Sequence, residues 1–121
     1  MITVDLKSRI PIYEQIVDSV KNAILSGILS PNEQLPAVRK LAVELAINPN
    51  TIQKAYLILE AQEIVYSIPG KGSFVADDTS TLVDSHRAKV LSDLKSLIED
   101  ATRCGISQSE LVSVIKEFAK E

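Results

Sequence analysis

The apolar residues near the start of the chain recur with the spacing of a one-sided helix. Between Pro11 and Gly27 they fall at i, i+3, i+4 and i+7, the pattern of a helix with one buried face. They are Tyr13, Ile16, Val17, Val20 and Ile24. Pro11 suits the first helical position, where its missing N–H would be unpaired in any case. The pattern therefore predicts a first helix that begins near Pro11 and ends at Gly27.

Two shorter one-sided helices are predicted next, after turn-forming residues that can supply a short strand near Gln34 and Leu35. Pro36 begins the second helix, whose apolar positions are Val38, Leu41, Ala42 and Leu45. The third helix begins at Pro49, with Asn48 as its N-cap. It places Ile52, Ala55, Tyr56 and Leu59 on its core-facing side. Two short helices joined so tightly predict a helix-turn-helix.

After Gln62 the period of the apolar residues changes from 3.6 to 2. The runs IVYSI and SFVA are typical of β-strands, and PGKG lies between them. Gly70 and Gly72 can both adopt positive φ there, which favours a hairpin. A helix-turn-helix followed by a two-stranded ribbon is a winged helix, so the expected fold class is α+β, with this domain at residues 10–78.

The remaining residues, 79–121, predict a separate helical region after a short polar linker at 77–81. One helix is expected over about 84–103, with Gly105 as its C-terminal cap, and a last helix follows a capping box of Ser107 and Glu110. Two such helices cannot close a core of their own. They either fold back on the first helix or meet a second copy across a two-fold axis. We favour a homodimer seam, formed by Val90, Leu91, Leu94, Leu97, Ile98 and Ala101.

Charge and composition set limits on this interpretation. The net charge is −3. Residues 1–76 hold seven Lys or Arg and seven Asp or Glu, whereas residues 77–121 hold six and nine, so the deficit lies in the helical region. Any basic surface must therefore be local. No apolar run approaches a membrane span, no signal peptide is evident, and Cys104 is alone. We expect a cytoplasmic protein without a membrane partner.

The third helix has an unusual polar beginning. Asn50, Gln53, Lys54 and Leu57 face away from its apolar side. Asn and Gln pair a donor with an acceptor, as adenine does in the major groove, and the first N–H groups of a helix can meet a phosphate. The alternative is a capped, solvated helix face. The helix before it and the hairpin after it favour the DNA-binding interpretation.

The same residues carry a resemblance to a known family. The segments PIYEQI, QLPAVRKLA, NPNTIQKAY and VYSIPGKGSFV resemble the DNA-binding domain of the GntR family of bacterial transcription regulators, over about residues 11–76. The two-helix tail resembles the YtrA-type branch, which lacks a large ligand-binding domain. The resemblance implies a homodimeric regulator, usually a repressor, on a palindromic DNA operator.

The resemblance also implies roles for individual residues. Arg39 matches an arginine that contacts DNA, and the polar tip of the recognition helix matches Asn48, Asn50 and Thr51. Gln53 and Lys54 occupy a pair that is often two arginines in this branch. Gly70 and Lys71 match the wing tip, which enters the minor groove in family members. Asn32, Ala46 and Glu63 stand where glycine is common.

Other functions find little support in the sequence. His86 has no second ligand at metal-binding spacing, and no Ser–His–Asp set can be built around it. The GKG segment lacks the spacing of a phosphate-binding P-loop. We therefore expect no enzyme, no metal and no cofactor. A winged helix used only for protein–protein interaction is the alternative function. A small-molecule effector stays open, and a cleft between two subunits is one place for it.

Overall fold

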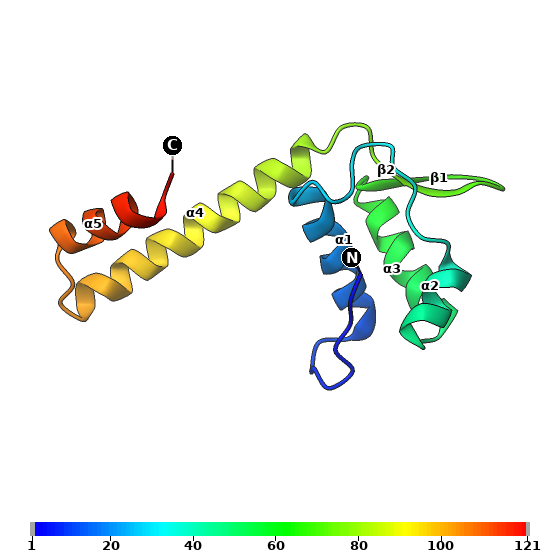
Figure 1. Cartoon of the computed structure of the whole chain (residues 1–121), viewed down its shortest axis with the longest axis horizontal. Coiled ribbons are helices and arrows are strands. Elements are labelled where there is room, and N and C mark those ends of the chain that lie inside the picture. The colour runs from blue at the N-terminus through cyan, green and yellow to red at the C-terminus, as the bar shows by residue number, and fades with distance from the viewer. Residues whose placement is uncertain (1, 121) are drawn as a thin grey trace. The chain divides into compact units, whose positions relative to one another are not determined.

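The computed structural model describes residues 2–120 of the 121-residue chain. Its elements are α1 (Ile12–Leu25), α2 (Val38–Leu45), α3 (Pro49–Ala61), β1 (Val65–Ile68), β2 (Gly72–Val75), α4 (Ser80–Arg103) and α5 (Gln108–Phe118). The chain divides into two compact units, Met1–Val83 and Asp84–Glu121. The first unit is a winged helix-turn-helix, so the α+β prediction is confirmed (Figure 1).

The core of the first unit joins its three helices to the hairpin. α3 packs against α1, α2 and β1 (Figure 1). The largest fully buried side chains come from α1, α3 and β2, and they are Ile16, Val20, Ile52, Leu59 and Val75. Burying an aliphatic side chain of this size stabilises the fold by about 2 kcal/mol relative to exposure. The helical spacing therefore predicted the buried positions of α1 and α3 except Tyr13, which is half-buried, as are Val38 and Leu45 of α2.

A third segment of the chain is hydrogen-bonded to the two-stranded hairpin. β1 and β2 pair antiparallel, with Tyr66 opposite Phe74 and their rings stacked 5.5 Å apart. Residues 32–35 run along the other edge of β2, where the N–H of Leu35 donates to the carbonyl of Ser73 (2.8 Å). Gln34 forms an isolated bridge to Phe74, so the short strand expected near Gln34 and Leu35 is reduced to a single paired residue. The hairpin is thereby fastened to the segment that precedes α2.

Two helix boundaries differ from the prediction. α2 begins at Val38 and not at Pro36, because Ala37 is its N-cap and has extended backbone (φ −60°, ψ 142°). The carbonyl of Pro36 accepts a hydrogen bond from the buried Tyr56 hydroxyl (2.7 Å). Burial also raises the pKa of that hydroxyl. α4 begins at Ser80 and not near residue 84, so the linker is shorter than predicted. The carboxylate of Asp78 accepts from the N–H of Ser80 (2.9 Å), and hydrogen bonding from Ser80 lowers the pKa of Asp78.

The second unit is a helical pair with almost no core. Ala101 is the one buried residue of α4, and no described residue of α5 is buried. Ser107 caps α5 by accepting from the N–H of Glu110 (3.2 Å), as predicted. Gly105 takes positive φ (89°) between the two helices. These two helices therefore leave most of their apolar side chains exposed.

Candidate nucleic-acid interface

The two sides of α3 differ as the sequence predicted. Ile52, Ala55, Tyr56 and Leu59 are buried. Asn50, Gln53, Lys54 and Leu57 are exposed, and Thr51 is half-buried. Because the buried side is fixed against α1 and α2, the orientation of the exposed side is fixed as well. The helix thus presents amide and ammonium groups to solvent within its first two turns.

Asn48 has a structural role at the beginning of α3. Its side-chain oxygen accepts a hydrogen bond from the N–H of Asn50 (2.8 Å), and Pro49 occupies the first helical position. A cap of this kind stabilises a helix by about 1 kcal/mol. The N-cap prediction is confirmed. The oxygen of Asn48 is therefore engaged within the chain, and its exposed amide nitrogen stays available as a donor.

The connection between α2 and α3 is a tight left-handed turn. Ala46 ends α2 with φ 55°, and the N–H of Ile47 donates back to the carbonyl of Ala42 (3.1 Å). This turn brings the beginning of α3 next to α2, where Arg39 lies exposed in the first turn. Asn32 (φ 66°) and Glu63 (φ 60°) are also left-handed. These three residues stand where glycine is common in the family that the sequence resembles. The left-handed backbone explains that glycine, because glycine adopts positive φ without strain.

The wing tip is a turn from Ile68 to Lys71. The N–H of Lys71 donates to the carbonyl of Ile68 (3.0 Å), and Gly70 has φ 77°. Pro at the second position and a left-handed Gly at the third match a type II turn. The predicted positive φ is confirmed at Gly70 and also at Gly72, where φ is 126°. Lys71 lies exposed at the end of the hairpin.

Gln34 holds this turn from outside the hairpin, an interaction that the sequence analysis missed. Its side-chain amide donates to the carbonyl of Lys71 (2.7 Å). A Cβ atom at Gly72 would lie 2.9 Å from the same nitrogen, so glycine leaves room for this bond. Only the pairing of residues 32–35 with β2 brings Gln34 there, and no local pattern announces it.

Lys54 makes a second interaction that the sequence did not reveal. Its ammonium lies over the ring of Tyr13, 3.9 Å from the ring centre. The Tyr13 hydroxyl donates to the carboxylate of Glu14 (3.3 Å), whose charge is the main cause that raises the pKa of Tyr13. A cation over an aromatic face is attracted by the negative charge density of the ring. Lys54 is therefore held at the edge of α3 that faces the beginning of α1.

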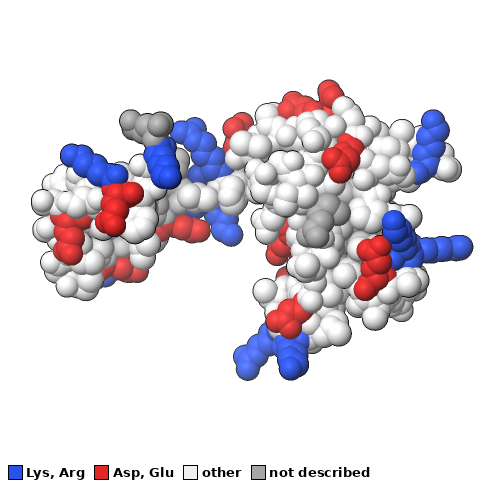
Figure 2. Space-filling model, in the orientation of Figure 1, with Lys and Arg blue, Asp and Glu red and all other residues white. Residues whose placement is uncertain are grey.

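Basic groups occupy three places on the first unit. Figure 2 shows Lys or Arg over the end of the hairpin, over α2, and over the loop that precedes α1. Among residues 2–120 the one salt bridge joins Arg103 to Asp100 in α4. Arg39 and Lys71 therefore remain free of acidic partners within the described chain. Exposed cations of this kind can neutralise the phosphates of a nucleic acid.

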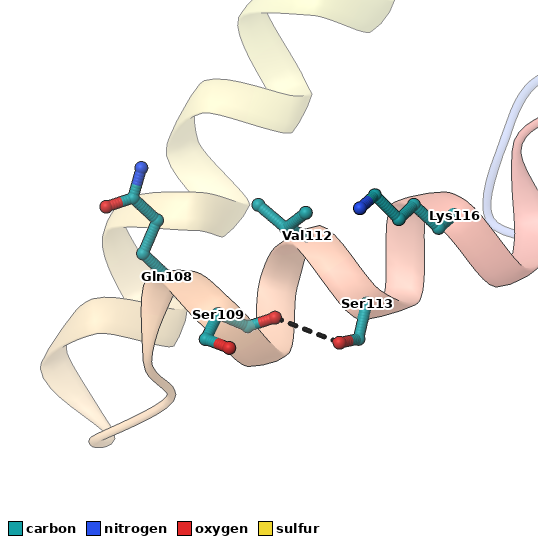
Figure 3. A pocket seen from close by; sticks show the side chains of 5 residues that line it. All are labelled: Gln108, Ser109, Val112, Ser113 and Lys116. Atoms are coloured by element: carbon teal, nitrogen blue, oxygen red, sulfur yellow. Dashed lines mark hydrogen bonds between the residues drawn. The ribbon is translucent and has the colours of Figure 1, made fainter.

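The second unit offers a shallow polar hollow on α5 alone. It is lined by Gln108, Ser109, Val112, Ser113 and Lys116, with Ser113 bonded to the carbonyl of Ser109 (3.0 Å; Figure 3). One helix supplies all of these residues, so the hollow is open and encloses no ligand. In the described residues no group of three His, Cys, Asp or Glu is placed to hold a metal ion. No helix within residues 2–120 is long and apolar enough to cross a membrane.

Comparison with known proteins gives one consistent result. The family described as "Bacterial regulatory proteins, gntR family" matches residues 12–75. The HTH-type transcriptional repressor YtrA of Bacillus subtilis (strain 168) is 38% identical, over 100% of this chain and 94% of that protein. A crystal structure of a transcriptional regulator from Oenococcus oeni superposes with a TM-score of 0.81 at 35% identity, covering 98% of each chain.

A further solved structure shows a related domain on DNA. It is the AraR DNA-binding domain in complex with operator ORE1, with a TM-score of 0.54 and 28% identity over 63% of this chain and 93% of that one. Fold, exposed recognition helix and relatives together define a DNA-binding transcription regulator of the winged-helix class. The chain belongs to the GntR family of bacterial regulatory proteins. These relatives do not favour the alternative of a protein-interaction module.

Proposed function

We propose that the protein is a cytoplasmic repressor that binds a palindromic operator as a homodimer, with one half-site for each winged helix. The similar YtrA protein is named a transcriptional repressor, and the similarity extends over the whole chain. A closed two-fold dimer matches a palindrome, because each subunit meets the same sequence in the same orientation. The observation that carries the proposal is the exposed polar side of α3, with cations on α2 and on the wing that form no salt bridge within residues 2–120.

In this arrangement the beginning of α3 enters the major groove. Asn50 and Gln53 face base edges, where an amide matches the N6 and N7 groups of adenine. Lys54 lies over Tyr13 at the edge of the helix and reaches a base edge or a phosphate. Arg39, Thr51 and the amide nitrogen of Asn48 serve as donors around the same groove.

The wing interacts with DNA separately. Gly70 and Lys71 form the tip of a hairpin that ends away from the helices (Figure 1). A lysine on such a tip can follow the phosphates into the minor groove without reading the sequence. Gln34 and Gly72 support this position by fixing the carbonyl of Lys71.

The helical unit provides the dimer seam. Val90, Leu91, Leu94, Leu97 and Ile98 lie on α4, and all five side chains are exposed in the single chain. A set of apolar residues this large, along one helix, typically marks an interface with another protein surface. Ala101 differs from these five because it is buried within the chain. Burial of the exposed five against a second copy would remove them from water.

Salt-dependent DNA binding tests the placement of α2 and α3. Arg39→Ala and Lys54→Ala should each weaken binding to a palindromic site, and the slope of log affinity against log salt should fall by about one unit for each phosphate that the variant no longer neutralises. Lys21→Ala removes the same charge from a later turn of α1 and serves as the control. Unchanged affinity and slope in both test variants would overturn this placement.

A further inference from the structure

The chain before α1 forms an ordered loop, residues 5–10, which we call the N-terminal loop. The side chain of Gln15, in the first turns of α1, makes three hydrogen bonds to it. Its oxygen accepts from the N–H of Asp5 (2.7 Å), and its nitrogen donates to the carbonyls of Asp5 (3.1 Å) and Ile10 (2.8 Å). Both N–H groups of the amide and one of the two acceptor positions of its oxygen are thus used on one short segment.

The loop is also fixed internally and at its beginning. The carboxylate of Asp5 accepts from the N–H of Lys7 (2.9 Å), and the hydroxyl of Ser8 accepts from the N–H of Ile10 (3.1 Å). Just before the loop, Ile2 is buried in the core, and the hydroxyl of Ser19 donates to the carbonyl of Thr3 (3.1 Å). Side chains carried by this loop therefore have a defined position relative to α1.

The loop lies at the end of α1 where α1 contacts Lys54 of the recognition helix α3. Gln15 and Tyr13 lie in the first turns of α1, and the ammonium of Lys54 from α3 lies over the Tyr13 ring. The loop that Gln15 holds and the contact between Tyr13 and Lys54 therefore lie at the same end of α1. Figure 1 shows the loop (dark blue) at the end of the unit where α1 begins, and Figure 2 shows basic groups over it.

The loop carries two cations, Lys7 and Arg9, and one acidic side chain, Asp5. Lys7 and Arg9 are exposed, and neither takes part in a salt bridge among residues 2–120. Asp5 accepts from the N–H of Lys7 and Glu14 accepts from the hydroxyl of Tyr13, so both carboxylates bind neutral donors and keep their charge. With one carboxylate and two cations, the loop has a net charge of +1. Phosphate oxygens are the natural partners of such exposed cations, and arginine can bind them through two parallel hydrogen bonds.

We infer that the N-terminal loop is an additional DNA-binding element of this protein. Lys7 and Arg9 bind backbone phosphates beside the major-groove segment that takes α3, and Gln15 is the positioning residue that holds the loop in place. The inference rests on the proposed placement of α3 in the groove. The loop binds phosphates and no bases, so it adds affinity and fixes the angle of the domain without changing the preferred sequence.

The double variant Lys7→Ala/Arg9→Ala tests this binding. It should weaken affinity several-fold on both a preferred and a scrambled duplex, and should lower the salt slope by about one unit for each phosphate that is no longer neutralised. Lys21→Ala, on a later turn of α1, should leave both quantities nearly unchanged. Wild-type affinity and slope in the double variant would overturn the inference, and so would an equal loss per charge in Lys21→Ala, which indicates only a long-range charge effect.

Gln15→Leu tests the positioning role, because it keeps a side chain of similar size and removes the three hydrogen bonds. It should weaken binding although Lys7 and Arg9 are present, and it should add little in the Lys7→Ala/Arg9→Ala background. An additive loss in that background would contradict the positioning role.

Arg39→Ala, measured in parallel, separates the inference about the loop from the proposed placement of α3. If Arg39→Ala weakens binding and Lys7→Ala/Arg9→Ala does not, the DNA-binding role of the loop is contradicted and the placement of α3 is retained. If neither variant weakens binding, both are contradicted.

Discussion

Within residues 2–120, three residues other than glycine adopt left-handed backbone conformations. Asn32, Ala46 and Glu63 have φ between 55° and 66°. Such a conformation costs most residues about 1–2 kcal/mol, and Asn less than others. The side chain of Asn32 compensates, because it donates to Asp77 (2.8 Å) and accepts from Tyr66 (3.0 Å). Ala46 has no polar side chain to compensate, and no side-chain hydrogen bond of Glu63 is present in the described chain.

Glycine at these positions should therefore act differently at each site. Ala46→Gly and Glu63→Gly should raise the free energy of unfolding by about 0.5–1 kcal/mol, after allowance for the greater freedom of glycine in the unfolded chain. Asn32→Gly should give no gain, since it loses both hydrogen bonds. Chemical denaturation of the three variants beside wild type measures this. Loss of stability in both Ala46→Gly and Glu63→Gly would show that the left-handed turns carry no strain.

At the scale of elements, a substitution in the wing distinguishes most clearly between an effect on folding stability and an effect on DNA binding. Lys71→Ala should change the free energy of unfolding by no more than about 0.5 kcal/mol, because the side chain is exposed and forms no salt bridge with any described residue. The same change should weaken DNA binding by a similar factor on preferred and scrambled sites, as expected for a residue that binds phosphate. Gel-shift titrations on both duplexes test this. Equal affinity of variant and wild type on both would mean that the wing is only a structural hairpin.

The helices and strands were largely predictable from the sequence. The side-chain contacts that hold them in place were not. Helical spacing and the Gly-containing turn are local patterns, so α1, α3 and the hairpin could be located from them. α4 begins earlier than expected because Asp78 caps it and Leu82 packs on the core of the first unit. The interactions of Gln34 with Lys71 and of Tyr13 with Lys54 join residues far apart in the chain. Such pairs become visible only once the fold brings them together.

At the scale of the whole molecule, the proposed account depends on a dimer formed through α4. Leu94→Asp should yield monomers, because a charge would have to be buried in the seam. Affinity for a palindromic site should then fall steeply, since two half-sites no longer act together. Ser96→Asp adds the same charge on the opposite side of α4 and should remain dimeric. Analytical ultracentrifugation measures both, and a dimeric Leu94→Asp protein would place the seam elsewhere.

The central claim is that two copies of α3 read a palindrome, and selection of bound sequences from a library of random DNA duplexes tests it most directly. The wild-type protein should enrich an inverted repeat, with one half-site for each subunit. Gln53→Ala should relax the preference at the same position in both half-sites and leave the spacing unchanged. Enrichment of no sequence, of a single asymmetric site, or of an identical repeat by wild type and Gln53→Ala would contradict the account.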